Sequence, residues 1–304
     1  MSRPPFLTLP ACASAYRLAT ARGEFAVHDA RPGPASPRRG TVLLVPGFTG
    51  SKEDFIALLE PLAAAGYRAV AVDGRGQHET PGPRDEAAYA QGELARDVLA
   101  QAAALTAEDG RPGIHLLGHS LGGLITRAAV LADASPFRSL TVMSSGAGSI
   151  SATQQARTRE LIQALAVLDM ESVWREMQRR DAENAAADGK APGLADFLHR
   201  RWTTTVPEQL MATGRQLIEE PDRTAELAAV PLPKHVISGV LDYAWPVPRI
   251  TEMAKELSAH RTIVSGAGHS PNAERPAETA EALVGFWRTT DPEPGAGRAE
   301  AWRA

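Results

Sequence analysis

The chain has 304 residues, of which 43% are hydrophobic and 22% are charged, and its formal net charge is −4 at pH 7. This length suffices for one large α/β domain with an insertion. A net negative charge with scattered basic residues argues against nucleic acid and against membrane surfaces as partners. The composition is that of a globular protein that is free in solution, and no motif indicates an oligomeric state.

The cysteine content and the N-terminal segment bear on the compartment. Cys12 is the single cysteine, so no internal disulfide can form. No His/Cys cluster has metal-ligand spacing, and we expect neither a metal nor a cofactor. The apolar patch near the N-terminus is interrupted by Pro4, Pro5 and Pro10, unlike a secretion signal. No stretch approaches the roughly 18 apolar residues that would indicate a membrane span. We therefore expect a cytoplasmic protein.

The first third of the chain shows two kinds of strand pattern. Residues 16–30 alternate between apolar and polar around a turn at Arg22 and Gly23, which predicts an antiparallel hairpin. Residues 41–48 are continuously apolar, as in a parallel strand that is buried on both faces. Helical spacing over 52–66 follows, and 67–76 predicts the next strand.

The middle of the chain repeats this alternation. We predict an amphipathic helix over 85–109, a strand over 113–120, a helix over 121–133 and a strand over 140–148. Strands that alternate with helices long enough to reverse the chain direction predict an α/β fold. Its sheet is open and mostly parallel, with helices on both faces.

The alternation then stops for about 80 residues and later resumes. Residues 150–230 are helical and poor in strands, which predicts an inserted helical cap, or lid, between the two parts of a core at 1–149 and 231–290. We expect the tail, 291–304, to be flexible, because it is rich in proline, glycine and charge. Within the second part we predict strands at 234–242 and 261–269 and helices at 248–258 and 273–287.

Ser120 lies where a buried strand is predicted to end and a helix to begin, inside the sequence Gly118-His-Ser-Leu-Gly122. Small residues at the flanking positions let the strand and the helix pass closely, and the sharp bend exposes the serine hydroxyl at the carboxyl edge of the sheet. The alternative is a glycine-rich turn that binds nothing. Because a hydroxyl alone is a weak nucleophile, the catalytic interpretation requires a base and an orienting acid.

From about Phe25 to Trp287 the sequence resembles the α/β-hydrolase family. This resemblance implies a sheet of the eight-stranded type, an inserted cap and the catalytic order Ser, Asp, His along the chain. Each matching motif lies at the carboxyl end of a predicted strand. The motifs are "PGFTG" (46–50), "GHSLGG" (118–123), "GVLDYAWP" (239–246) and "GAGHSP" (266–271).

The resemblance implies that His269 is the general base and that Asp242, 27 residues earlier, orients its ring. A loop histidine can also be simply solvated, and Asp242 can be a turn residue that caps the next helix. His78 is the rival histidine, and we interpret it as part of the rim of the site. The backbone N–H groups of Phe48 and Leu121 are assigned to the oxyanion hole.

Aromatic residues suggest how the pocket is lined. Trp174 and Trp202 in the cap, together with Trp245 just after Asp242, are candidate substrate-binding residues, although such residues often only pack. We expect an apolar cleft without an arginine cluster, which favours a hydrophobic acyl or aromatic small-molecule substrate over a charged one.

These observations predict a serine hydrolase that cleaves a carboxylic ester through an acyl-enzyme. The alternatives on the same three residues are a carbon–carbon bond hydrolase, a thioesterase, a lactonase and a perhydrolase. Serine at position 120 argues against haloalkane dehalogenases and epoxide hydrolases, which resemble this fold but carry aspartate there. An alternative of another class is a non-catalytic protein that holds a ligand under the cap.

Overall fold

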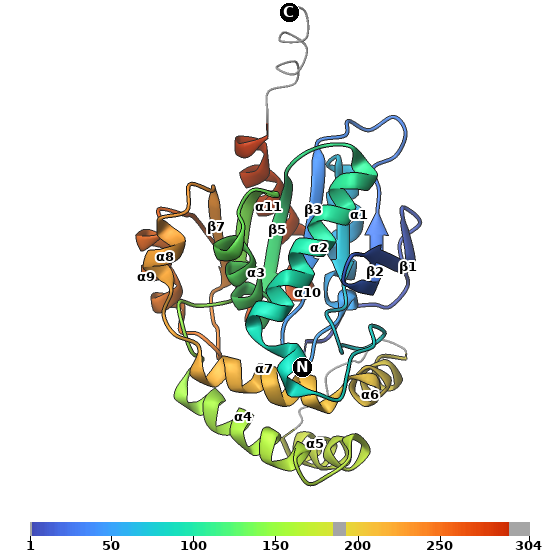
Figure 1. The fold of residues 1–304 in the computed structure, drawn as a ribbon, viewed down its shortest axis with the longest axis vertical. Coiled ribbons are helices and arrows are strands. Elements are labelled where there is room, and N and C mark those ends of the chain that lie inside the picture. Colours follow the sequence, from blue (N-terminus) through green and yellow to red (C-terminus); the bar gives the residue numbers. More distant parts are fainter. Residues whose placement is uncertain (1, 185–192, 292–304) are drawn as a thin grey trace, which may run out of the picture.

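The computed structural model describes residues 2–184 and 193–291. In these ranges eight strands form one sheet that carries helices on both faces, and further helices lie across one end of it (Figure 1). This arrangement confirms the predicted fold class. Of the tail predicted to be flexible, residues 292–304 lie outside the described residues.

The sheet has the strand order β1-β2-β4-β3-β5-β6-β7-β8. β1 pairs antiparallel with β2, as the alternating pattern of residues 16–30 predicts, and β2 pairs antiparallel with β4. All later pairings are parallel. The strands are β1 (Ala13–Thr20), β2 (Gly23–Ala30), β3 (Gly40–Val45), β4 (Tyr67–Val72), β5 (Ile114–His119), β6 (Phe137–Met143), β7 (Lys234–Gly239) and β8 (His260–Val264).

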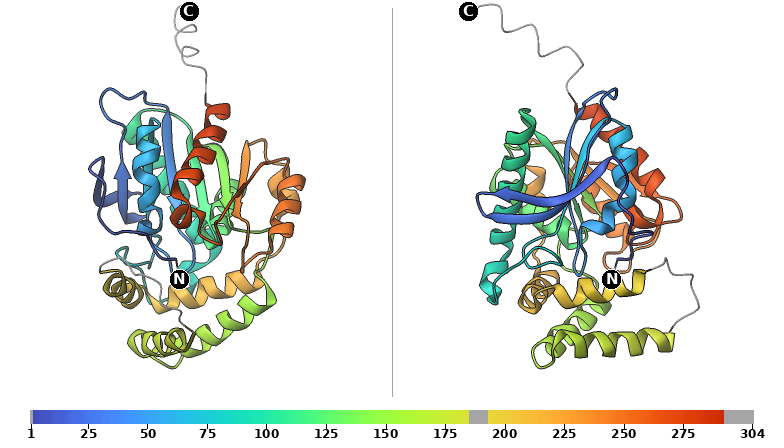
Figure 2. Two further views of the ribbon diagram at one scale, coloured as in Figure 1. Left: turned by 180° about the vertical axis from the view of Figure 1, so that it is seen from behind. Right: turned by 90° about the vertical axis from the view of Figure 1, so that its right-hand side faces the viewer.

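The continuous apolar run of β3 is explained by its position in the middle of the sheet. Leu43 and Val45 pack into one hydrophobic core, whereas Val42 and Leu44 pack into a second core on the other face. Successive side chains of a strand point to opposite faces, so a strand covered on both sides must be apolar throughout. One face carries α2 (Gln91–Asp109), α3 (Leu121–Ala132) and α9 (Val247–Glu256), and the other carries α1 (Ile56–Ala64) and α11 (Pro276–Thr290) (Figure 2).

Four helices form a layer across the carboxyl ends of the parallel strands (Figure 1). They are α4 (Ala152–Leu165), α5 (Met170–Asn184), α6 (Leu194–Thr204) and α7 (Pro207–Glu219). Their inner side chains form a separate hydrophobic cluster that includes Trp174 and Trp202. The next helix, α8 (Thr224–Ala228), packs against α3 and α9 instead. The division of the chain into a core and a cap over 150–230 stays our proposal.

The helix predicted over 85–109 is divided in the structure. A short 3-10 helix, η2 (Glu86–Tyr89), comes first, and Ala90 then adopts an extended conformation before α2 begins. The side chain of Gln216 in α7 donates a hydrogen bond of 2.7 Å to the Tyr89 carbonyl oxygen. This contact with a distant helix fixes the break, which helical periodicity alone does not reveal. The remaining short helices are η1 (Lys52–Phe55) and α10 (Pro271–Glu274).

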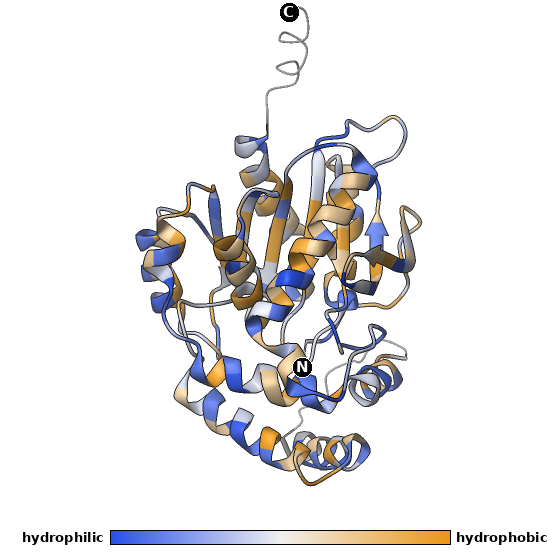
Figure 3. Cartoon of the chain, viewed as in Figure 1, coloured by the Kyte–Doolittle hydropathy of each residue, from blue (hydrophilic) through white to orange (hydrophobic). Residues whose placement is uncertain are grey.

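Hydropathy follows the layers of the fold. The central strands are strongly apolar, whereas polar residues alternate with apolar ones along α4 and α7 (Figure 3). In the part of the chain that the structure describes, no helix combines the length and the hydrophobicity needed to cross a membrane. The helices of the four-helix layer are amphipathic, because polar residues alternate with apolar ones along them. Their apolar sides meet one another and the sheet edge.

Candidate active site

Ser120 occupies the sharp turn between β5 and α3. Its backbone angles are φ 55° and ψ −120°, which a residue other than glycine rarely adopts. A Cβ atom at Gly118 would lie 2.2 Å from the Gly122 carbonyl oxygen, and one at Gly122 would lie 2.3 Å from that of Val45. The flanking glycines are therefore required by close backbone contacts, and the serine is held in a strained position, as the sequence predicts.

Three side chains from different parts of the chain form one line of hydrogen bonds. The Ser120 Oγ atom is 3.0 Å from His269 Nε2, and His269 Nδ1 is 2.9 Å from Asp242 Oδ2. Ser120 follows β5, Asp242 follows β7 and His269 follows β8. The carboxyl ends of these parallel strands lie at one edge of the sheet, which brings the three residues together.

The Asp242 side chain is completely buried and well supported. Its Oδ1 atom accepts hydrogen bonds from the backbone N–H groups of Ala244 and Trp245, at 2.8 and 3.0 Å. Its other oxygen is left to accept the Nδ1 proton of His269. This arrangement holds the imidazole tautomer whose Nε2 lone pair accepts the Ser120 hydroxyl proton.

The two backbone groups assigned to the oxyanion hole lie at the start of α3 and in the loop after β3. Leu121 is the first residue of α3, so its N–H has no acceptor within the helix. The Phe48 N–H donates to no acceptor in residues 2–184 and 193–291. Phe48 lies in the loop after β3, and it lines the same cavity as Ser120. Both N–H groups are thus available to an oxygen atom of a substrate.

The Gln77 side chain holds the loop after β3, which carries Phe48. The sequence alone did not single this residue out. Its buried side chain donates a hydrogen bond of 3.0 Å from Nε2 to the Gly47 carbonyl oxygen. Its Oε1 atom accepts the Gly74 N–H at 2.9 Å. The Gly47 carbonyl and the Phe48 N–H belong to the same planar peptide, so fixing one fixes the other.

His119, next to Ser120, is a second residue whose role the sequence does not reveal. The ring is buried, and its Nε2 atom lies 2.8 Å from the His269 carbonyl oxygen, to which it donates. Burial, and then the nearby His269 ring, lowers the pKa of His119 to about 4. A neutral His119 therefore anchors the backbone of the loop that carries His269.

His78, the rival histidine, lies away from the cavity. Its side chain is buried, and the ring Nδ1 atom is 3.0 Å from the Thr204 Oγ1 atom. The backbone N–H of His78 donates to Thr205 Oγ1 at 3.2 Å. Burial lowers its pKa to about 4. His78 thus joins the loop after β4 to the end of α6.

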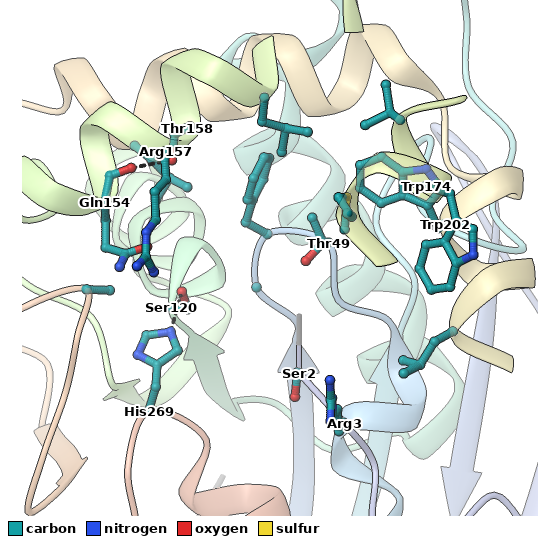
Figure 4. Close-up of a pocket in the computed structure, with 18 of the residues that line it drawn as sticks. Ser2, Arg3, Thr49, Ser120, Gln154, Arg157, Thr158, Trp174, Trp202 and His269 are labelled. Carbon is teal, nitrogen blue, oxygen red and sulfur yellow. Dashed lines mark hydrogen bonds between the residues drawn. The ribbon is translucent and has the colours of Figure 1, made fainter. Parts of the chain in front are cut away.

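A cavity of about 850 Å³ lies between the sheet edge and the four-helix layer, and Ser120 and His269 form part of its wall (Figure 4). Trp174 and Trp202 line it, as the sequence predicts, and they stand at the opposite end from Ser120. Trp245 does not line it. The Trp245 indole is buried in the main core, where its Nε1 atom donates to the Gly148 carbonyl oxygen at 2.8 Å.

The cavity is less apolar than expected, because arginines line it too. Arg3 comes from the N-terminal segment, Arg157 from α4 and Arg180 from α5. They are far apart in the sequence, and only the folding of these segments over the sheet edge brings them to one cavity. The expectation of an apolar cleft is therefore only partly met, because three arginines contribute to its lining. In the described parts of the chain, no three His, Cys, Asp or Glu side chains gather to hold a metal ion.

Curated relatives match only part of the chain. RutD of Variovorax paradoxus, which carries the provisional name of a carbamate hydrolase, is 38% identical over 102 residues, 34% of this chain and 36% of that protein. A dihydrolipoyllysine-residue acetyltransferase component of an acetoin-cleaving system from Cupriavidus necator is 38% identical over 134 residues, 43% of this chain and 31% of that protein. The chain thus spans about a third of the length of each.

Solved structures resemble most of the chain. A thermophilic esterase from Thermogutta terrifontis has a TM-score of 0.70 at 22% identity, over 92% of this chain and 100% of that one. An esterase from Exiguobacterium antarcticum has a TM-score of 0.71 at 18% identity, over 90% and 100%. At this identity the likeness shows a shared fold. The model of the alpha/beta hydrolase family matches residues 42–282, well over half of the chain. The chain therefore belongs to the alpha/beta hydrolase family.

Proposed function

We propose that the protein hydrolyses carboxylic esters of small molecules through an acyl-enzyme. Ser120 is the nucleophile, His269 is the general base and Asp242 orients the His269 ring. The observation that carries the proposal is the continuous hydrogen-bond line from Ser120 through His269 to Asp242 at the wall of the cavity.

In the first half of the reaction, the Ser120 Oγ atom attacks the carbonyl carbon of the ester while His269 Nε2 takes the hydroxyl proton. The carbonyl oxygen becomes negatively charged and accepts hydrogen bonds from the N–H groups of Phe48 and Leu121. The C–O bond to the alcohol then breaks, and protonated His269 gives its proton to the departing alkoxide. The acyl group remains on Ser120.

In the second half, water replaces the alcohol. The oxygen atom of the water attacks the acyl carbon while His269 takes a proton from the water. The bond between the acyl carbon and the Ser120 Oγ atom then breaks, and the proton passes from His269 to Oγ. Asp242 stays ionised and stabilises the imidazolium in both halves. The products are a carboxylic acid and an alcohol, so one water is consumed in each turnover.

The experiment is hydrolysis of p-nitrophenyl esters from acetate to laurate by the wild type and by Ser120→Ala. Activity that passes through a maximum along the series and is lost in the variant, by at least about 10³-fold, is the expected result. Equal rates for the two proteins would overturn the proposal. A carbamate ester belongs in the same assay, because RutD carries a carbamate hydrolase name.

A fluorophosphonate probe separates an enzyme from a protein that only holds a ligand. We expect rapid labelling of Ser120, because the hydrogen bond to His269 activates the hydroxyl. Folded protein that never labels would favour the non-catalytic alternative. In that case the p-nitrophenyl assay would also be negative, and the two results would agree.

We further propose that the protein acts in the cytoplasm. This rests on Cys12 as the single cysteine, which rules out an internal disulfide. Fractionation of cells that produce the protein at its natural level tests this location, and recovery outside the cytoplasm would contradict it.

A further inference from the structure

The acidic side chains that line the cavity are each engaged by an arginine. Asp54 pairs with Arg201 at 2.8 Å, and Glu160 pairs with Arg180 at 3.2 Å. Glu176 accepts from Arg179 at 2.7 Å and from Arg180 at 3.0 Å. These pairs leave no carboxylate in the described part of the cavity to neutralise a further cation there.

Arg157 is such a cation. Within residues 2–184 and 193–291, nothing accepts a hydrogen bond or an ion pair from its guanidinium group. By contrast, Arg159, two residues further along the same helix, donates to Gln155 Oε1 at 2.9 Å and does not line the cavity. The guanidinium of Arg157 therefore retains its full donor set for a ligand.

The direction of Arg157 is set by the face of α4 on which it lies. Arg157 and Thr158 lie three and four residues after Gln154, and Leu161 lies four residues after Arg157, so the four share one face of the helix, and all of them line the cavity. Figure 4 shows the Arg157 side chain pointing from α4 toward the pair formed by Ser120 and His269, with Gln154 beside it.

Tyr243 lies on the same side of the cavity as the His269 ring. Its ring centroid lies 4.6 Å from that of His269. Partial burial and the nearby Asp242 and Glu274 carboxylates raise the pKa of the Tyr243 phenol to about 12, and the positive charge of Arg157 acts in the opposite direction. Arg157 is thus close enough to this neighbour of His269 to influence its ionisation.

We propose that Arg157, assisted by Gln154, binds a carboxylate of the substrate next to the scissile ester, so that the substrates are esters with an anionic group. A guanidinium binds a carboxylate through two parallel hydrogen bonds, and the Gln154 amide can donate a third. The apolar end of the cavity, with Trp174 and Trp202, takes the rest of the molecule. This inference rests on the proposed ester hydrolysis, and it replaces the earlier expectation that charged substrates are disfavoured.

The test compares esters that differ only in a carboxylate. Butyl hydrogen succinate and butyl pentanoate carry the carboxylate, or an ethyl group in its place, on the acyl side. Carboxyethyl butanoate and butyl butanoate do so on the alcohol side. For the wild type we expect kcat/KM to favour the charged member of one pair by about tenfold or more. The pair that shows the preference tells on which side of the ester Arg157 binds.

Arg157 is then replaced by a neutral residue of similar length. We expect the ratio of charged to neutral kcat/KM to fall to about one in Arg157→Gln and to be partly retained in Arg157→Lys, which keeps the charge but not the planar fork. Arg159→Gln, the matched control on the same helix, keeps the wild-type ratio. A ratio of one or less in the wild type for both pairs, or a ratio unchanged in Arg157→Gln, would overturn the proposal.

Failure of this inference is distinguishable from failure of ester hydrolysis. If the neutral esters are hydrolysed without a charge preference, the proposed function stands and the carboxylate site falls. If the wild type hydrolyses no ester, calorimetry tests the carboxylate site separately. Binding of butyl hydrogen succinate is measured in the Ser120→Ala variant and in the same variant with Arg157→Gln added. Binding that is lost in Ser120→Ala/Arg157→Gln supports the site, and equal binding by the two variants overturns it.

Discussion

Gln77 shows how a side chain that does not touch the substrate can affect the negative charge that is proposed to develop on the substrate's carbonyl oxygen. It donates to the Gly47 carbonyl oxygen, which also accepts the Gly50 N–H at 3.1 Å. Because the peptide is planar and trans, these bonds direct the Phe48 N–H to the opposite side, toward the cavity. They also polarise the peptide, which strengthens its N–H as a donor.

Replacing Gln77 by leucine therefore weakens the proposed oxyanion hole without touching the substrate. We expect kcat for an ester to fall about tenfold while KM changes little, since the oxygen accepts its strongest hydrogen bonds in the transition state. A boronic acid that mimics the tetrahedral intermediate should lose affinity by a similar factor, whereas a product carboxylic acid should not.

The control is Gln101→Leu, which makes the same change at another buried glutamine, on α2 and outside the cavity. Both variants lose a buried amide and are expected to lose stability. Only Gln77→Leu should affect kcat. Equal kinetic losses in the two variants would show that Gln77 acts through general stability alone.

At the scale of the elements, a buried ion pair joins the four-helix layer to the sheet edge. Arg201 of α6 is paired with Asp54 of η1 at 2.8 Å, and both side chains are almost completely buried. Arg201 also donates to the Ser2 carbonyl oxygen at 2.7 Å, so it holds the N-terminal segment at the cavity. Three segments far apart in the sequence thus depend on one guanidinium group.

We expect Arg201→Met to lower the free energy of unfolding by about 3–5 kcal/mol, because Asp54 is left buried without its partner. The double variant Arg201→Met/Asp54→Asn removes the uncompensated charge and should recover part of the loss. Urea denaturation measures both. Arg200→Met, at the exposed neighbouring position, is the control and should change stability by less than about 0.5 kcal/mol. An equally small loss in Arg201→Met would contradict a structural role for the pair.

At the scale of the whole molecule, several histidines are buried in the neutral form. His235 of β7 is one of them, and its Nε2 atom lies 2.9 Å from Thr262 Oγ1. Burial, followed by the charges of His260 and Arg261, lowers its pKa from the ordinary 6.5 to about 3. The unfolded chain binds a proton at this residue near its ordinary pKa, but the folded protein does not.

Stability should consequently fall as the pH falls below the ordinary histidine pKa. Between about pH 7.5 and about pH 5, the wild type should lose about 2 kcal/mol relative to His235→Gln, since glutamine does not titrate. Chemical denaturation of both proteins at both pH values measures this difference. A difference that is independent of pH, or protonation of the folded His235 ring seen by NMR above about pH 5, would contradict it.

Much of the fold and of the candidate site could be predicted from the sequence. The strand pattern predicted the sheet, and the glycines around Ser120 predicted the bend. The prediction of one helix over 85–109 was wrong because a contact from Gln216 breaks it at Ala90. Trp245 was placed in the cavity from its position beside Asp242, but neighbouring residues point in different directions, and its indole lies in the core.

By itself, the sequence determined the order of strands and helices and the three residues that meet at the sheet edge. The order of elements depends on periodicity, which local patterns carry. The choice of His269 and Asp242 as partners of Ser120 is what the resemblance to the α/β-hydrolase family implies. Only the tertiary structure decided that Gln77 and His119 support the loops of the site and that Arg157 lines the same cavity as Ser120. Such contacts join residues far apart in the chain, and their geometry follows from how the helical layer packs on the sheet.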